Sequence, residues 1–172
     1  MEYLSRHQIV TALEALNRHM MRQNLHAQIN LVGGAVMCLV YHARPTTKDV
    51  DAWFSESSAV RKAARQVAEE LGLPEDWLND AAKAFIPEQA GFELWQSLSH
   101  VDVLVADART LLAMKCAAAR TAEDVGDIRF LADKLGLNSV QAILDVVLSY
   151  YPADRLPVRV RLLLEEIYGD SE

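Results

Sequence analysis

Two adjacent glycines, Gly33 and Gly34, stand between a short apolar run and a longer helical one. Residues 29–32 have the composition of a strand, and residues 35–42 form a helical pattern that stops before Pro45. Glycine lets a backbone turn tightly and approach a phosphate closely. The strand–Gly-Gly–helix unit is therefore either a phosphate-binding turn or a purely structural turn, and in both cases it requires a sheet.

The rest of the chain mixes strands with helices and then becomes helical. Apolar residues at helical spacing follow a capping-box sequence, Ser5-x-x-Gln8. Strands are expected over residues 29–32, 49–54, 92–98 and 101–105, and helices over 5–24, 35–42, 57–71, 75–83, 108–119, 122–135, 138–149 and 155–168. Ser57 and Ser58 are the expected caps of the third helix. This order predicts an α+β fold, a small mixed β-sheet with packed helices and a helical C-terminal half.

Composition favours an ordinary globular protein. Of the 172 residues, 51% are hydrophobic and 24% charged, which allows a sizeable core. Cys38 and Cys116 both lie among apolar residues and read as buried thiols in a reducing compartment. No apolar run has the length of a membrane span and no signal pattern is evident, so a cytoplasmic protein without membrane contact is expected.

Two aspartates, Asp49 and Asp51, begin the second predicted strand. Side chains at i and i+2 of a strand point the same way, so the two carboxylates can hold one divalent ion. Without a cation between them they would repel each other. A magnesium site is one interpretation, and a solvent-facing strand end with incidental acids is the other.

A third carboxylate, Asp102, lies in an otherwise apolar predicted strand. An acid in a buried strand is costly without a partner. If this strand lies beside Asp49 and Asp51, the three acids could bind two metal ions, and Asp102 could also act as a base on an attacking hydroxyl. An edge-strand acid that faces water is the alternative.

A further charged cluster spans two predicted helices. Lys115 and Arg120 precede Asp124 and Asp127, and Asp124 continues the apolar stripe of its helix. An acid on a buried stripe requires a cation. The cluster is either a salt-bridge network between helices or a group in which Lys115 reaches a phosphate.

In combination, these residues resemble the stand-alone minimal nucleotidyltransferases of the DNA polymerase β superfamily, and most closely the AbiEii-toxin-like group of bacterial proteins. The resembling segments are Val32-Gly33-Gly34, Arg44, Thr47-Lys48-Asp49-Val50-Asp51, Leu112-Ala-Met-Lys115, Arg120 and Asp124-Val-Gly-Asp127-Ile128. They cover residues 29–135 in order. Two departures are an extended turn at Pro45-Thr46 and a short C-terminal part.

The resemblance implies a function for each matched position. Asp49 and Asp51 would bind Mg²⁺ or Mn²⁺, Lys115 would hold phosphate and Asp127 would support the catalytic centre. Asp102 is the third expected metal ligand and catalytic residue, on the strand argument given above. The nucleotide-binding residues would be Gly33, Gly34, Arg44, Thr47 and Lys48. The implied reaction moves a nucleoside monophosphate from an NTP to a hydroxyl of RNA, tRNA or protein. A toxin role, with an antitoxin protein as partner, is also implied.

Two other functions are consistent with the sequence to different degrees. An inactive nucleotidyltransferase-fold module would bind only a nucleotide or a partner protein. A zinc or thiol site is disfavoured because the cysteines lack CxxC spacing. Residues 1–106 are expected to form the nucleotidyltransferase core, and residues 107–172 a helical part packed on it.

Overall fold

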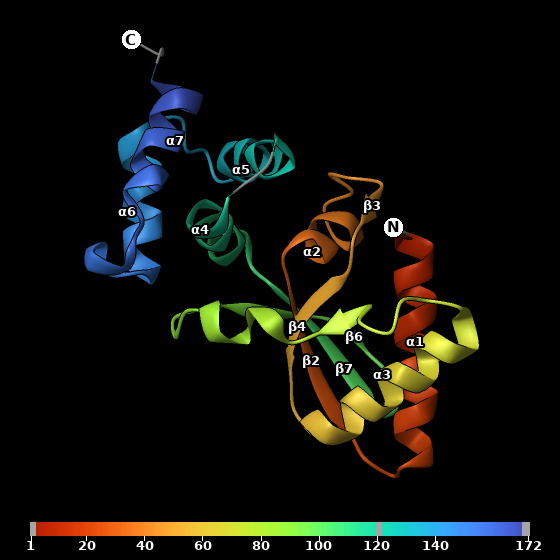
Figure 1. Ribbon diagram of the computed structural model, residues 1–172. Helices are drawn as coiled ribbons and strands as arrows, with labels where there is room; N and C mark the ends of the chain where they lie inside the picture. The colour runs from red at the N-terminus through yellow and green to blue at the C-terminus, as the bar shows by residue number, and fades with distance from the viewer. Residues whose placement is uncertain (1–2, 120–121, 170–172) are drawn as a thin grey trace. The chain divides into compact units, whose positions relative to one another are not determined.

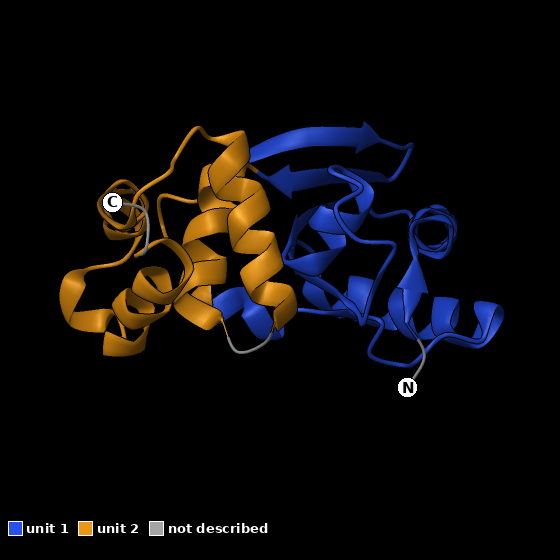
Figure 2. Ribbon diagram, turned by 90° about the horizontal axis from the view of Figure 1, so that it is seen from above, with its two compact units in different colours: residues 1–84, 92–106 blue, residues 85–91, 107–172 orange. Residues whose placement is uncertain are grey.

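The computed structural model describes residues 3–119 and 122–169, which form two compact units. The first unit comprises residues 1–84 and 92–106, and the second comprises residues 85–91 and 107–172 (Figure 2). The chain changes units at residue 85, at residue 92 and again at residue 107. The segment 85–91, which the sequence assigned to the core, belongs to the second unit.

The first unit is organised around a five-stranded mixed sheet (Figure 1). The strand order is β5-β4-β2-β7-β6; β2 pairs in parallel with β7 and antiparallel with β4. The strands are β2 (Ala27–Val32), β4 (Val50–Phe54), β5 (Leu78–Asn79), β6 (Phe92–Ser97) and β7 (Val101–Ala106). The predicted mixed sheet is confirmed.

One face of this sheet is apolar because alternate strand residues point to the same side. The residues on that face are buried: Ala27, Ile29, Leu31, Val50, Ala52, Phe54, Val101, Val103 and Val105. The helices α1 (Arg6–Arg22) and α3 (Ser57–Leu71) lie side by side on this unit (Figure 1). The opposite face carries Asp51, Trp53, Asn30 and Asp102.

Local sequence explains where α1 begins but not where α3 begins. Ser5 Oγ accepts from Gln8 N, and Gln8 Oε1 accepts from Ser5 N, so the predicted capping box is confirmed. For α3 the predicted serine cap is wrong. Glu56, with φ 50°, occupies the N-cap position, and the Ser57 hydroxyl instead donates to Phe54 O.

A second, two-stranded sheet stands next to the glycine turn. The strands β1 (Leu4–Ser5) and β3 (Thr46–Thr47) pair antiparallel, with Leu4 opposite Thr47. The sequence did not predict these short strands. They anchor the loop between α2 (Gly34–Leu39) and β4.

The predicted helix over residues 75–83 is wrong. The segment instead forms β5, which pairs in parallel with β4, and a 3-10 helix over Ala81–Phe85. Tertiary pairing overrides helical propensity here, since Asn79 lies opposite Asp51 in the sheet.

The second unit is helical, as predicted. It contains α4 (Ala108–Ala118), α5 (Ala122–Lys134), α6 (Val140–Tyr150), the 3-10 turn Ala153–Arg155 and α7 (Val158–Tyr168). Asp107 caps α4 and Ser139 caps α6, each by accepting a bond from a first-turn amide. None of the described helices combines the length and the apolar character needed to cross a bilayer.

Candidate functional site

The glycine turn brings the chain directly against Asp51. Gly33 follows β2 with φ 68° and ψ −149°, a backbone conformation that residues other than glycine rarely adopt. A Cβ built on Gly33 would lie 3.4 Å from Asp51 Oδ2. The bare Cα of this residue therefore faces a carboxylate oxygen.

The second glycine is surrounded more closely still. A Cβ built on Gly34 would lie 2.7 Å from Thr47 Oγ1 and 2.9 Å from Arg44 Nη1. Contacts this short are essentially never seen for a real Cβ, so a side chain at Gly34 would have to displace the hydroxyl or the guanidinium. The structure therefore brings together Gly33, Gly34, Arg44, Thr47 and Asp51.

Asp49 lies immediately before β4 and is half-buried. Thr47 Oγ1 donates to the Asp49 main-chain oxygen at 3.2 Å, which ties this residue to β3. Burial raises the pKa of the Asp49 carboxyl, while the charge of Lys48 and a hydrogen bond from Asn79 act to lower it. A carboxylate held partly out of water gains much from a bound cation.

Asn79 is a member of the site that the sequence did not indicate. Its Nδ2 donates to Asp49 Oδ2 at 3.3 Å, and in the β4–β5 register it lies opposite Asp51. The amide is itself fixed, because its Nδ2 also donates to Asp76 O and its Oδ1 accepts from Ala81 N. The sequence gave no signal for the contact between Asn79 and Asp49, because the segment around Asn79 was expected to be a helix.

Asp102 does not join Asp49 and Asp51. Asp51 pairs with Val32 on β2, whereas Asp102 pairs with Gln28, four residues earlier on that strand. At about 3.3 Å per residue, the two positions are separated by roughly 13 Å along the strand. The expected three-carboxylate group is therefore wrong, because Asp102 is not part of it.

Asp102 has partners of its own at the far end of β7. Ser97 Oγ donates to one carboxylate oxygen at 2.5 Å, and His26 Nε2 lies 2.8 Å from the other. These hydrogen bonds, that from Ser97 first, lower the pKa of Asp102. This group explains the acid in the strand without a metal ion.

The charged cluster of the second unit is also assembled. Lys115 Nζ lies 3.1 Å from Asp124 Oδ1 and 2.9 Å from Asp127 Oδ2, linking α4 to α5. The Lys115 and Asp127 side chains are only 13% and 6% exposed. Arg120, the other predicted member, lies outside the described residues.

Asp49 and Asp51 provide the type of donor that suits Mg²⁺. The ion prefers carboxylate oxygens and commonly takes one or two of them together with substrate phosphates and water. Among residues 3–119 and 122–169, no group of three or more His, Cys, Asp or Glu side chains is placed to hold a metal. The two-carboxylate arrangement, beside a glycine whose Cα is bare, still fits an ion shared with a phosphate.

Comparison of the chain with family models, with curated proteins and with solved structures gives no match. Function is therefore inferred from the residues and distances of the first unit. There, Arg44, Thr47 and Asp51 lie against the glycine turn, and Asp49 lies two residues before Asp51 with its carboxylate hydrogen-bonded to Asn79. Such a group can bind a polyphosphate and a divalent cation together.

Proposed function

We propose that this protein is a Mg²⁺-dependent nucleotidyltransferase that moves a nucleoside monophosphate from an NTP to an acceptor hydroxyl. The observation that carries the proposal is the close approach of the glycine turn to Asp51. A Cβ on Gly33 would lie 3.4 Å from Asp51 Oδ2, and one on Gly34 would press on Arg44 and Thr47. Groups suited to a phosphate and to a cation would thus be neighbours, as transfer from a triphosphate requires.

The residues of the turn would bind the triphosphate. The main-chain N–H groups at Gly33 and Gly34 can approach phosphate oxygens without a side chain in the way. Arg44, which lies against Gly34, adds a planar guanidinium suited to phosphate. Thr47 would act indirectly, since its hydroxyl holds the Asp49 main chain.

Asp49 and Asp51 would hold Mg²⁺ or Mn²⁺. When bound, the ion would neutralise charge on the phosphate oxygens during in-line displacement. The acceptor oxygen would attack the α-phosphorus, and the bond to the pyrophosphate leaving group would break. Asp102 is not proposed as the base, because the strand register places it away from the pair.

Lys115 and Asp127 keep a proposed role that follows only from the resemblance. The Lys115 ammonium is paired with Asp124 and Asp127, so its contribution to phosphate binding would compete with those ion pairs. RNA, tRNA or a protein is the proposed acceptor. A toxin role with an antitoxin partner, in the cytoplasm, belongs to the same proposal.

Incorporation of label from α-labelled NTPs tests the activity. The purified protein is incubated with Mg²⁺, each of the four NTPs, and total RNA or protein as acceptor. Asp51→Asn should abolish labelling, and so should removal of Mg²⁺ with a chelator. Asp102→Asn is the matched control, because it neutralises an acid on the same face of the same sheet. It should leave labelling within about twofold of the wild type, since substitutions away from a functional site usually have small effects.

One observation favours an inactive binding module as a second candidate. The strand register separates Asp102 from Asp51, so that at most two of the three expected carboxylates remain at the glycine turn. Calorimetry distinguishes the two functions. NTP binding that is unaffected by Mg²⁺ removal, together with equal labelling by wild type and Asp51→Asn, would favour the module and reject the transferase.

A further inference from the structure

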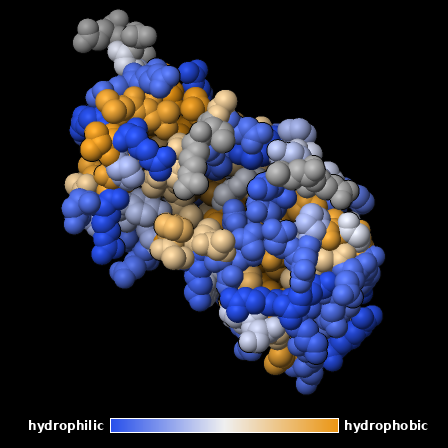
Figure 3. Space-filling model, viewed as in Figure 1, coloured by the Kyte–Doolittle hydropathy of each residue, from blue (hydrophilic) through white to orange (hydrophobic). Residues whose placement is uncertain are grey.

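The outward face of α7 leaves apolar side chains uncovered. Val158 is 80% exposed and Leu162 is 59% exposed, one helical turn apart. Figure 3 shows hydrophobic surface where α7 lies in the view of Figure 1. Two adjacent exposed aliphatic side chains on one helix mark a candidate interaction surface.

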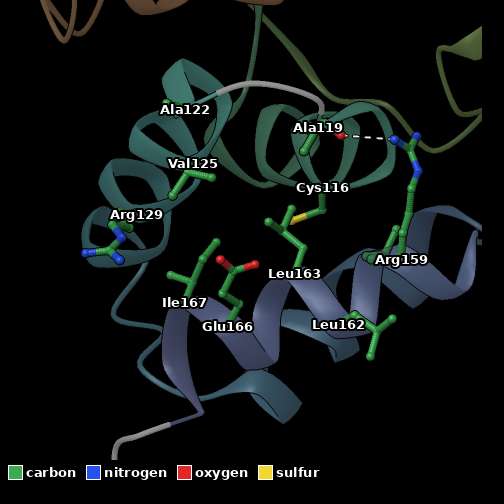
Figure 4. A pocket seen from close by; sticks show the side chains of 11 residues that line it. Cys116, Ala119, Ala122, Val125, Arg129, Arg159, Leu162, Leu163, Glu166 and Ile167 are labelled. Atoms are coloured by element: carbon green, nitrogen blue, oxygen red, sulfur yellow. Dashed lines mark hydrogen bonds between the residues drawn. The ribbon is translucent and has the colours of Figure 1, made fainter.

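The inner side of α7, in contrast, is engaged within the second unit. It borders a cavity of about 530 Å³, and Leu163, Ile167 and Cys116 line it (Figure 4). Arg159 closes part of the rim by donating to Ala117 O and Ala119 O at the end of α4, at 3.2 and 3.1 Å. Arg159 thereby ties this side of α7 to α4; Leu162 also borders the cavity, whereas Val158, Arg161 and Glu165 do not line it.

The charges of α7 are in the reverse of the order that an isolated helix favours. Its first turn contains no acid and its last turn contains no base. Arg159 and Arg161 instead occupy the N-terminal half, and Glu165 and Glu166 the C-terminal half. A helix carries partial positive charge at its N-terminus and partial negative charge at its C-terminus, so this order opposes the helix dipole.

An antiparallel copy of the same helix would meet these charges with opposite ones. It would place basic residues beside acidic residues, and each end of the dipole beside its opposite. At 100° per residue, Val158, Arg161, Leu162 and Glu165 all fall on one face of α7. The Arg161 guanidinium lies 4.0 Å from the Glu165 carboxylate within the helix, so the two charges are on the same flank.

We propose that the outward face of α7 is the docking surface for a second copy of this chain, with the two α7 helices antiparallel about a two-fold axis beside Leu162. Leu162 is buried beside the axis, and each Val158 is buried toward an end of the contact. Arg161 faces Glu165 of the partner subunit, and the symmetry repeats the contact, as a self-complementary two-fold interface requires. The inference does not depend on the proposed catalytic activity.

Sedimentation velocity and native mass spectrometry of the whole chain test this arrangement. The wild type should form dimers whose dissociation constant rises with salt. Leu162→Ser should weaken dimerisation, and so should Arg161→Glu or Glu165→Arg, each by more than about tenfold because like charges then meet twice. Lys62→Glu, a charge reversal at an exposed position of α3 in the first unit, is the matched control and should dimerise normally.

Mixing the two charge variants gives the sharpest result. Arg161→Glu and Glu165→Arg should each be monomeric alone yet form a 1:1 heterodimer together, because both cross-helix contacts become attractive. Damage to folding cannot produce this recovery, and circular dichroism confirms that each variant is folded. A monomeric wild type, a dimer that survives both single reversals, or a mixture that stays monomeric would each overturn the proposal.

Discussion

The Asn79 side chain donates a hydrogen bond to Asp49 Oδ2 at 3.3 Å and is itself held by the Asp76 carbonyl and the Ala81 amide. Asn79 lies on β5, opposite Asp51 of β4. Asn79 therefore fixes the Asp49 carboxylate from β5, the strand that pairs with β4 at Asp51. Groups that orient a metal-binding carboxylate control its affinity even though they do not touch the ion.

Asn79→Ala should weaken the proposed cation site. Loss of the donor frees the Asp49 carboxylate and removes a hydrogen bond that lowers its pKa. The expected loss of Mg²⁺ affinity is about 10- to 100-fold. Calorimetry with Mg²⁺ in the presence of a non-hydrolysable NTP measures it. Asn138→Ala, at an exposed position of the second unit, is the control and should not change the affinity.

Gly34→Ala should damage the site through packing. The added Cβ would meet Thr47 Oγ1 at 2.7 Å and Arg44 Nη1 at 2.9 Å, so one of these groups must move. We expect a loss of about 1–3 kcal/mol in the free energy of unfolding, as for overpacked cores, and weaker NTP binding. Urea denaturation and calorimetry provide the two measurements.

Gly126→Ala is the matched control for that substitution. Gly126 lies inside α5, without a positive φ, and a Cβ there would have nothing within 4 Å. Alanine should therefore stabilise the helix by up to about 1 kcal/mol. Equal effects of the two glycine substitutions would contradict the crowding described at Gly34.

Local sequence patterns predicted part of the site, and long-range pairing decided the rest. Gly33, Gly34 and Asp51 could be predicted as candidate site residues because the turn and the strands that contain them have sequence patterns only a few residues long. Asn79 could not, because its contact with Asp49 spans 30 residues and its own segment was expected to be helical.

The misplacement of Asp102 has a related cause. Its strand was predicted correctly, and it does lie in the same sheet as Asp51. What periodicity cannot supply is the register, which places Asp102 opposite Gln28 and Asp51 opposite Val32. Two acids can therefore occupy one sheet face and still be at different ends of it.

Lys115→Met should destabilise the second unit. Asp127, only 6% exposed, would lose a cation 2.9 Å away, and Asp124 would lose the same partner. Removing one partner of a buried ion pair costs up to about 3–5 kcal/mol, and the loss is smaller to the extent that other groups still contact the carboxylates. Thermal denaturation measures the loss, with Lys62→Met as the exposed control.

A second substitution distinguishes a structural role of this cluster from a catalytic one. In the Lys115→Met background, Asp127→Asn removes a buried charge that has lost its Lys115 partner and should recover part of the lost stability. Labelling by NTP that stays low in the double variant although the fold is restored would give Lys115 or Asp127 a role beyond stability. Recovery of both stability and labelling would restrict Lys115 to a structural role.

The link between α1 and α3 should depend on pH through Glu70. Its carboxylate lies 2.8 Å from His19 Nε2 and 2.9 Å from Arg18 Nη2, and these hydrogen bonds, that of His19 first, lower the pKa of Glu70. A carboxyl whose pKa is lower in the folded state stabilises the fold above its unfolded value, near 4.5. That contribution disappears as the pH falls through the folded value.

Glu70→Gln should therefore lower the melting temperature at pH 7, and the difference from the wild type should shrink as the pH falls below the unfolded value near 4.5 and through the lower folded pKa. The effect should be modest and should shrink in high salt, since Glu70 and Arg18 are both well exposed. Glu69→Gln, its exposed neighbour on α3, should leave the melting temperature unchanged at every pH. A difference for Glu70→Gln that persists undiminished at pH 3 would show that its effect does not arise from the charged pair.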